Sequence, residues 1–499
     1  MRDYQVGEKT ASAARSSEPF ELCVVGAGLA GLNALWVASE YLPTGARVVL
    51  IDRHSRCGGM WTQTYDFVRL HQPHPYFTVG DIPWDWDKPA HYLATKPEIL
   101  HHFDHCLTIL RSKFFLVELF GYEADLDAAT DLAGQKGLRV HCRPSDPQGS
   151  ARVVDARRFI VARGNGVPDA TPLALSSRAV ESATPVDMAR YLARDEAAPV
   201  YVVGSGKTGM DCAQQAIGDH WQRSICMIAG RGTVFFDRSY VAPAGWRRWR
   251  DGQLLLKIFG DVAMRFDGTN GDEAFAYFKE KYALSLNGSG ENCFFGYLSG
   301  EECRMVESGL SEKIDEYLDD VIDSPDGPVM QFRSGRTRPV KPGSIFVNCT
   351  GFLLRGASQP AGPISRGGVL LNISSRGSLH FLSSVSAYFL THLFFSERRS
   401  KAPVYAIDTH ALFAIDRRAW FMAATTQAFL NPLVLIDALP IRAFHRCGLN
   451  TDRLFPLPRI MAVLAETKAK RKKYVVHCRR SLERVARQYG VRCGEIDWC

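Results

Sequence analysis

The sequence lacks the cysteine patterns that would assign a protein class at once. Its 13 cysteines run from Cys23 to Cys499 without a C-x-x-C pair, which excludes a zinc ribbon and a thioredoxin-type dithiol. A chain of 499 residues is also too long for a disulfide scaffold, so we expect free thiols in a reducing compartment. The first nineteen residues are polar, and we therefore expect no secretory signal and a cytoplasmic location.

Long hydrophobic runs and a strong charge of one sign are missing as well. Residues 377–396 and 419–436 are uncharged, but both contain polar side chains that a lipid-facing helix would not carry. We expect no transmembrane span, and we expect these runs to be buried or to line an apolar pocket. The net charge of +7 is too small to indicate nucleic acid. The length and the 46% of hydrophobic residues predict two or three globular domains.

Motifs of several enzyme classes are absent. The sequence has neither the serine motif G-x-S-x-G nor the zinc motif H-E-x-x-H. His101 and His105 share one helical face, but no third ligand is evident, so we expect no metal site. Residues 206–208 resemble the end of an ATP phosphate loop. That loop needs glycine at position 201, where Tyr201 stands, which excludes a kinase or ATPase.

What the sequence does contain is the same local pattern twice. The first copy is an apolar run FELCVV, a glycine turn GAGLAG, a helical stretch with leucines on one face, and a second apolar run VVLID. The second copy, at residues 199–230, has VYVV, GSGKTG, a helical stretch and ICMIA. Buried strands that alternate with helices predict two units of parallel sheet rather than a short-period repeat.

The first glycine turn has the spacing of a dinucleotide site. A lone G-x-G-x-x-G is weak, because chance supplies about 0.3 matches in a chain with 42 glycines. Here Gly26, Gly28 and Gly31 follow an apolar strand and open an expected amphipathic helix, and Asp52 closes the next strand. The glycines permit a tight turn, close approach of a pyrophosphate, and close packing of helix on strand. Asp52 is placed to accept hydrogen bonds from ribose hydroxyls.

The second glycine turn differs in one respect. Gly204, Gly206 and Gly209 repeat the spacing, but the second strand ends in AGRG with Arg231 instead of a carboxylate. An acidic residue repels a 2′-phosphate, whereas arginine pairs with one, so we favour NADPH over NADH. The alternative is that Arg231 is a solvated loop charge.

Other stretches give coarser expectations. Residues 60–120 predict loops and then a helix from Lys96 to Leu119, and residues 121–164 predict a polar hairpin region ending in the strand RFIVA. Acidic helical character is expected around Ser311 to Ile322, and a strand is expected over 344–351. The last thirty residues predict a helix rich in Lys and Arg.

Several of these residues resemble one known family. The first turn, Asp52 and the segment Gly58-Gly59-Met60-Trp61 resemble the FAD half of the flavin-containing and Baeyer–Villiger monooxygenases. Asp81-Ile82-Pro83 is similar to a turn that precedes a helix in such enzymes, and residues 204–209 are similar to their NADPH fingerprint. The segments 349–351 and 162–164 resemble the two Ala-Thr-Gly linkers, with Arg163 replacing Thr. The resemblance covers most of residues 20–232 and about 344–355.

The resemblance implies an α/β fold with two Rossmann-like dinucleotide-binding domains, in which a discontinuous FAD domain holds an inserted NADPH domain. The implied ranges are a polar tail over 1–19, FAD domain over 20–195, NADPH domain with an insertion over 196–343, and FAD-domain return with a helical substrate region over 344–499. The residues expected to bind the cofactors FAD and NADPH are Gly26, Gly28, Gly31, Asp52, Arg53, Gly59, Met60, Trp61, Gly204, Gly206, Lys207, Thr208, Gly209, Arg231, Thr350 and Gly351.

The implied activity is an FAD-dependent oxidoreductase in which NADPH reduces the flavin and O2 serves the monooxygenation of a small organic substrate. One alternative is a flavin dehydrogenase or reductase with an acceptor other than oxygen. A second alternative is a non-catalytic, redox-sensing module that only binds dinucleotides. The sequence indicates neither the substrate nor the oligomeric state.

The sequence also departs from the family pattern. The Phe-x-Gly-x-x-x-His signature before the second turn is absent, and the corresponding stretch reads AVESATPVDMARY. The family's Asn near the flavin has no clear match, and Leu70-His71-Gln72 lies roughly there. His71 or Gln72 is our candidate for contact with flavin or substrate, and a structural polar loop is the alternative. Cys57 has no nearby partner cysteine, which argues against a disulfide reductase.

Two basic clusters complete the inventory of candidate sites. Residues 246–250 read WRRWR, and we expect stacking on a neighbouring loop rather than nucleic-acid binding. The cluster at 468–473 is expected to be a solvated helix face, with weak peripheral contact to an anionic membrane as the alternative.

Overall fold

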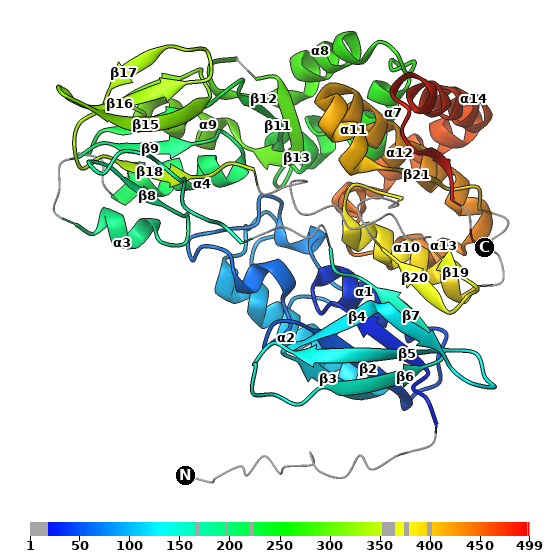
Figure 1. The fold of residues 1–499 in the computed structure, drawn as a ribbon. Helices are drawn as coiled ribbons and strands as arrows, with labels where there is room; N and C mark the ends of the chain where they lie inside the picture. The colour runs from blue at the N-terminus through cyan, green and yellow to red at the C-terminus, as the bar shows by residue number, and fades with distance from the viewer. Residues whose placement is uncertain are drawn as a thin grey trace.

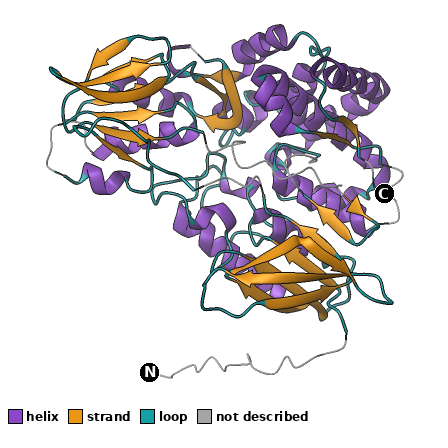
Figure 2. Cartoon of the chain, viewed as in Figure 1, coloured by secondary structure: helices purple, strands orange, loops and turns teal. Residues whose placement is uncertain are grey.

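The chain folds around two mainly parallel sheets and a bundle of helices. The computed structural model describes residues 18–164, 169–194, 198–219, 223–288, 290–351, 365–373, 379–396, 402–496 and 498. Figure 1 shows the first sheet at the bottom, the second at the upper left and the helical bundle at the upper right. Figure 2 shows that strands dominate the first two regions and helices the third.

The first sheet holds the first glycine turn at the carboxyl end of a central strand. Six strands lie in the order β19-β20-β7-β1-β2-β3, and every pair is parallel except β19 with β20. Strand β1 is buried at every position, as expected for an apolar strand covered on both faces. The strands are β1 (Leu22–Val25), β2 (Ala46–Asp52), β3 (Phe114–Phe120), β7 (Phe159–Val161), β19 (Ser365–Arg366) and β20 (Leu370–Asn372).

Helices cover one face of this sheet. Helix α1 (Leu29–Ala38) follows the glycine turn and packs against α2 (Lys96–Lys113) and α10 (Ser383–Phe395). The expected amphipathic character of α1 is wrong, because residues 30–38 are all buried between these neighbours. The helix expected to reach Leu119 ends at Lys113, since the following residues pair with β2 as strand β3.

A small antiparallel sheet covers the opposite face. Its strands are β4 (Tyr122–Asp131), β5 (Leu138–Pro144) and β6 (Arg152–Ala156), which confirms the hairpin region expected over 121–164. Ala124, Val140 and Val154 from this sheet share one apolar cluster with Val25 and Ile51 of the first sheet. The two coverings explain why β1 and β2 are apolar on both faces.

The second sheet repeats the arrangement. Five parallel strands lie in the order β14-β10-β9-β18-β8, and α4 (Lys207–Asp219) and α9 (Gly300–Gly309) pack against each other beside them. The sheet includes strands from both sides of the expected 196–343 range. Strand β18 pairs in parallel with β9, and β8 pairs in parallel with β18. The strands are β8 (Glu181–Ala183), β9 (Val200–Val203), β10 (Ile225–Ile228), β14 (Glu312–Ile314) and β18 (Ile345–Asn348), with helix α3 (Met188–Leu192) after β8.

The acidic segment around 311–322 is not helical. It forms β14 and then β15 (Leu318–Ser324), which pairs antiparallel with β16 (Gly327–Phe332), and β16 pairs with β17 (Thr337–Pro339). The carboxylate of Asp320 accepts hydrogen bonds from Ser176, and that of Asp323 accepts one from Ser177. These bonds to a distant segment favour the extended form over the helix that the acidic residues suggested.

The third region combines a short sheet with a helical bundle. Strands β11 (Thr233–Asp237), β12 (Ala283–Leu284) and β13 (Asn292–Leu298) form one sheet, and β21 (Tyr405–Ile407) pairs with β22 (Cys493–Glu495). The helices are α5 (Arg238–Val241), α6 (Arg247–Arg250), α7 (Leu255–Ala263), α8 (Gly271–Tyr282), α11 (Thr409–Ile415), α12 (Arg417–Ala438), α13 (Ile441–His445) and α14 (Leu457–Tyr489). Short 3-10 turns lie at Gly59–Thr62, His74–Tyr76, Leu286–Gly288 and Thr451–Leu454.

Helix α12 is the apolar centre of the bundle. It packs against α7, α8, α11 and α14, and its residues 419–431 are all buried. Among the described residues it is the one helix long and apolar enough to cross a membrane, and 89% of its most apolar window is buried inside the protein. The other uncharged run, at residues 377–396, contains α10, whose residues 386–394 are also buried. The central, described parts of both runs are buried, which is one of the two alternatives that we expected.

Candidate functional site

The first glycine turn has a backbone that only glycine fits. Gly26 adopts φ +111°, and a Cβ added there would lie 2.4 Å from the carbonyl oxygen of Ala162. A Cβ on Gly31 would lie 1.7 Å from the carbonyl oxygen of Gly26, so α1 packs directly on the turn. These two contacts place the amino end of α1 directly after the carboxyl end of β1, where a pyrophosphate binds in Rossmann-like folds.

A second glycine segment lies over the same turn. Gly28 precedes α1 and makes no side-chain cap, and a Cβ on Gly59 would lie 2.9 Å from the Cα of Gly28. Met60 is 55% exposed, whereas the ring of Trp61 packs edge-on to Phe77 with centroids 5.5 Å apart. The predicted residues of these two segments therefore lie together at the amino end of α1.

Asp52 is held more firmly than the sequence indicated. Its Oδ2 accepts a hydrogen bond of 2.6 Å from the backbone N–H of Ala27, and its Oδ1 accepts one of 2.8 Å from that of His54. The carboxylate is 7% exposed and so fixes the end of β2 against the turn. Contact of Asp52 with a ribose stays a prediction. The side chain of the neighbouring predicted residue Arg53 is exposed.

The second glycine turn has the same geometry as the first. Gly204 adopts φ +110°, and a Cβ there would lie 2.8 Å from the carbonyl oxygen of Cys349. A Cβ on Gly209 would lie 1.9 Å from the carbonyl oxygen of Gly204, while a Cβ on Gly206 would meet no atom of the described residues within 4 Å. The side of the turn at Gly206 is therefore open.

The two linker segments occupy equivalent places. Ala162 follows β7 and lies against Gly26, and Cys349 follows β18 and lies against Gly204. Thr350 is oriented by Asn348, whose Oδ1 accepts hydrogen bonds from the Thr350 N–H (3.1 Å) and hydroxyl (2.8 Å). Each linker thus closes one glycine turn from the strand beside it, and the predicted Gly351 follows at φ +84°.

Lys207, a predicted cofactor residue, is paired within the protein. Its ammonium group contacts the carboxylate of Asp211 one helical turn later. Asp211 also accepts a hydrogen bond of 2.7 Å from the hydroxyl of Tyr65, which belongs to the first domain. Burial and this carboxylate raise the pKa of Tyr65 well above its usual value, so the hydroxyl keeps its proton.

Arg231 lies in the turn between β10 and β11, flanked by two glycines with positive φ. Its side chain is 69% exposed, and its guanidinium lies 3.6 Å from the carboxylate of Glu291. Glu291 also lies 3.4 Å from Arg418 of the helical bundle. Pairing of Arg231 with a 2′-phosphate stays a prediction, and Glu291 is the acidic group that would compete for the guanidinium.

His71 lies at the junction of the two domains. Its Nδ1 accepts a hydrogen bond of 3.0 Å from the N–H of Tyr297, and its carbonyl oxygen accepts one of 3.1 Å from Arg238. Burial, assisted by the nearby cations Lys207 and Arg238, lowers the pKa of His71 to about 3. The ring is therefore neutral at pH 7, with its proton on Nε2 because Nδ1 is an acceptor.

Arg238 itself is neutralised. Its guanidinium contacts the carboxylate of Glu302 at the start of α9. Although burial raises the pKa of Glu302, the cations Arg238 and Lys207 hold it below its usual value, so both partners are charged. The pair is mostly buried, so removal of either partner would leave the other as a buried charge without a counter-charge.

Gln72 has an unsatisfied polar atom. Its side-chain oxygen Oε1 is buried and receives no hydrogen bond from the described residues. Buried amide oxygens are normally paired, so an unpaired one next to the domain junction indicates a place for a ligand donor. Of the two candidates named from the sequence, His71 uses its hydrogen bonds to hold the domain junction together. The Oε1 of Gln72 has no partner among the described residues and is free to accept a hydrogen bond.

Five residues of this junction were not predicted from the sequence. Asp211 could have been found, because it stands four residues after Lys207, the spacing of a helical ion pair. The others contact partners more than sixty residues away and leave no local pattern; they are Tyr65, Arg238, Tyr297 and Glu302.

The histidine cluster on α2 is structural in character. His101 pairs with Asp85 at 2.7 Å, and the ring of His102 stacks on Trp84 at 3.9 Å. Burial lowers the pKa of His102 to about 3. Across the described ranges, no three His, Cys, Asp or Glu side chains gather as metal ligands, and the twelve described cysteines are free and buried.

The comparisons with known proteins agree with this geometry. A family model described as an NAD(P)-binding Rossmann-like domain matches residues 24–106, which contain the first turn. The polycyclic ketone monooxygenase of the thermophilic fungus Thermothelomyces thermophila has a TM-score of 0.50 and 13% identity, covering 92% of this chain and 89% of that one. This chain shares the fold of that monooxygenase. The prediction of an α/β fold with two Rossmann-like dinucleotide-binding domains is thereby confirmed.

Relatives in sequence carry no assigned activity. Uncharacterized proteins of Mycobacterium tuberculosis (strain H37Rv) and Mycobacterium bovis are each 27% identical over 399 residues, covering 75% of this chain and 67% of theirs. The shared fold and these relatives leave the reaction to be inferred from the site.

Proposed function

We propose that this protein is a cytoplasmic FAD-dependent oxidoreductase that is reduced by NADPH and uses O2 to oxygenate a small organic substrate. FAD is assigned to the turn at Gly26–Gly31, and NADPH is assigned to the turn at Gly204–Gly209. The buried free thiols, which are typical of a reducing compartment, support the proposed location.

One observation carries the proposal. The two glycine turns have matching geometry, with positive φ at Gly26 and Gly204 and a linker carbonyl against each. The hydrogen bond from Tyr65 to Asp211 joins a loop of the first domain to helix α4 at the second turn, so two dinucleotides would meet at the carboxyl ends of two parallel sheets. A chain that bound one nucleotide for structural reasons would not need the second turn.

The chain supplies binding and orientation. At the first turn, the backbone N–H groups at the start of α1 would hold the FAD pyrophosphate, and Asp52 would contact the ribose. At the second turn, the open side at Gly206 would admit NADPH, and Arg231 would pair with its 2′-phosphate. When bound, FAD supplies the two-electron chemistry that links a nicotinamide to oxygen.

The junction residues set the polarity of the space between the turns. Neutral His71 anchors its loop to β13 through Tyr297, and the buried Gln72 Oε1 would accept a hydrogen bond from a cofactor or substrate N–H group. Trp61 and Phe77 form an apolar wall beside Gly59, which would exclude water from the reacting atoms.

A reductase with an acceptor other than oxygen is the second candidate. It is favoured by the segment 179–191, where the family carries its histidine signature. Here the segment contains no histidine, and it forms strand β8 and part of helix α3.

Anaerobic spectroscopy separates these possibilities. The protein is loaded with FAD, mixed with NADPH or NADH without oxygen, and the flavin absorbance is followed; oxygen is then admitted and peroxide is measured. Reduction by NADPH with slow peroxide release supports the monooxygenase, and immediate stoichiometric peroxide supports the reductase. Tight FAD binding without reduction by either nucleotide contradicts both and points to a binding module.

A further inference from the structure

Helix α14 concentrates the positive charge of the chain. Its 33 residues include ten Lys or Arg and two Glu, whereas the whole protein has a net charge of only +7. The remainder of the chain is therefore close to neutral. Such segregation of charge onto one helix makes a local field that attracts an anionic surface.

The exposed cations of α14 are largely free of acidic partners. Lys470 pairs with Glu466 at 2.8 Å, but Lys468, Lys472 and Lys473 form no ion pair with any described residue. A surface cavity of about 620 Å³ lies among them. Its lining combines cationic and apolar side chains: Met264, Ala469, Lys470, Lys472, Lys473, Val476, His477 and Arg480.

Exposed apolar side chains continue the same face toward the start of the helix. Leu457, Met461 and Leu464 are 68%, 55% and 41% exposed. They are followed by Lys468 and Lys472 at spacings of three or four residues, which place all five on one side of α14. An apolar stripe that runs into a cationic one is typical of helices that lie on membranes.

Helix α6 and the residue that precedes it add two tryptophans beside this face. Trp246 and Trp249 are 75% and 51% exposed and stack on each other with centroids 6.3 Å apart, rather than on a neighbouring loop as the sequence suggested. Arg459 of α14 ties α6 in place by donating hydrogen bonds to the carbonyl oxygens of Arg248 (2.6 Å) and Gly252 (2.5 Å). Tryptophan and arginine together are favoured at the interface of a bilayer.

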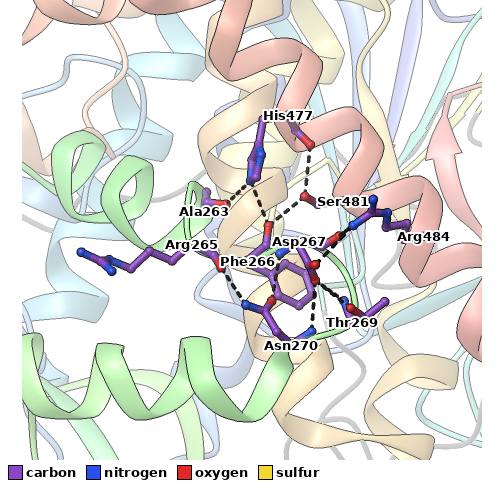
Figure 3. A network of polar contacts seen from close by, with 9 residues as sticks. All are labelled: Ala263, Arg265, Phe266, Asp267, Thr269, Asn270, His477, Ser481 and Arg484. Atoms are coloured by element: carbon purple, nitrogen blue, oxygen red, sulfur yellow. Dashed lines mark hydrogen bonds and ion pairs between the residues drawn. The ribbon is translucent and has the colours of Figure 1, made fainter.

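The inner side of α14 fixes this surface to the body of the protein. Figure 3 shows His477 and Ser481 directed at the carbonyl oxygen of Phe266, at 3.0 and 2.8 Å, and Arg484 bonded to Asp267. His477 Nε2 also approaches the carbonyl of Ala263 at 3.2 Å. The cationic face is thus presented by a helix that cannot rotate without breaking these bonds.

We propose that α6 and the outer face of α14, hereafter the α6–α14 surface, bind peripherally to an anionic lipid bilayer. Lysines without acidic partners meet acidic headgroups, the cavity at Lys472 and Lys473 receives a phosphate-bearing headgroup, and Trp246, Trp249 and Met461 enter the interfacial layer. Nucleic acid would also attract the cations, but it gives no reason for exposed Leu457, Met461 and Leu464.

The test is sedimentation of the full-length, FAD-loaded protein with phosphatidylcholine vesicles that contain or lack phosphatidylserine. The proposal predicts binding only with phosphatidylserine and loss of binding as salt rises. Each lysine removed weakens binding about fivefold, so Lys472→Glu with Lys473→Glu weakens it by roughly 25-fold or more. The matched control, Lys136→Glu with Arg152→Glu on the β4–β6 sheet, makes the same charge change on exposed residues and leaves binding unchanged.

A second pair of variants keeps the proposal testable if the charge reversal perturbs folding. Trp246→Ser with Trp249→Ser changes only exposed side chains and also weakens binding to the acidic vesicles. The proposal is overturned if both variant pairs bind as the wild type does. It is equally overturned if an oligonucleotide is bound while acidic vesicles are not.

Discussion

The hydroxyl of Tyr65 donates a hydrogen bond of 2.7 Å to Oδ2 of Asp211, joining the loop after the Gly59–Thr62 segment to helix α4 of the second turn. Asp211 is also the ion-pair partner of Lys207. One buried carboxylate therefore links the two domains and neutralises a cation at the second turn. This contact joins the two domains together with those that His71 makes to Tyr297 and Arg238.

Removing that hydroxyl tests the link. Tyr65→Phe leaves one acceptor of a buried carboxylate unsatisfied, and we expect a loss of stability of about 1–3 kcal/mol. FAD retention is unchanged, because Tyr65 does not contact the first turn, whereas the rate of flavin reduction by NADPH falls. Chemical denaturation and anaerobic reduction kinetics measure the two effects. A variant that lost FAD but kept its reduction rate would contradict this role.

The crossing of Gly28 and Gly59 is expected to determine FAD binding. A Cβ on Gly28 would lie 3.4 Å from the Cα of Gly59, and the branches of valine would fill the space at the amino end of α1. Gly28→Val therefore loses bound FAD, which absorbance of the purified protein reports. Gly218→Val is the control, because a Cβ there meets nothing within 4 Å. Stoichiometric FAD in the Gly28 variant would refute the assignment of the first turn.

Arg231 and Glu291 are expected to set the choice of nicotinamide nucleotide. Arg231→Ser removes the expected partner of a 2′-phosphate and lowers the preference for NADPH over NADH by about tenfold. Glu291→Gln frees the guanidinium and raises that preference. The KM values for both nucleotides measure the effect, and Arg304→Ser, an exposed arginine on α9, is the control. An unchanged preference for NADPH in the Arg231 variant would contradict a role in nucleotide choice and would show that Arg231 is a solvated loop charge.

Asp452 gives a prediction about pH. Its carboxylate accepts hydrogen bonds from the N–H groups of Leu255 (2.5 Å) and Leu256 (3.0 Å), and burial raises its pKa to about 6. The folded state then binds more protons than the unfolded state between about pH 4 and pH 6. The stability that Asp452 contributes is therefore present at low pH and is lost as the pH rises through this interval, by about 3 kcal/mol.

Asp452→Asn isolates that contribution. The difference in unfolding free energy between wild type and variant, from urea titrations at several pH values, cancels the groups that the two proteins share. We expect this difference to change between about pH 4 and pH 6 and to be flat above. A difference independent of pH would show that Asp452 titrates normally.

The two glycine turns could be predicted because local sequence determines them. Gly26, Gly31, Gly204 and Gly209 follow apolar strands, and their backbone requirements arise within a few residues, so the spacing alone locates both turns. Strand β3 was missed because residues 96–119 contain no internal break, and only pairing with β2 ends the helix at Lys113. Tertiary contacts override local propensity in such segments.

The junction could be predicted only in part. His71 and Gln72 were selected because they lie in a loop after the flavin motif, but their partners are distant in sequence. The contact between His71 and Tyr297 spans 226 residues, and no periodicity reports such a pairing. Likewise, Asp320 was read as a helix former because its bond to Ser176 is invisible in the sequence.

The central claim is that the second turn holds the nucleotide that reduces the flavin at the first. Its most direct measurement compares Gly206→Val with Gly218→Val, since a Cβ at either position meets no described atom within 4 Å and neither should unfold the protein. We expect both variants to retain FAD, and only the Gly206 variant to lose anaerobic reduction of the flavin by NADPH. Reduction of the Gly206 variant at the wild-type rate would contradict the account.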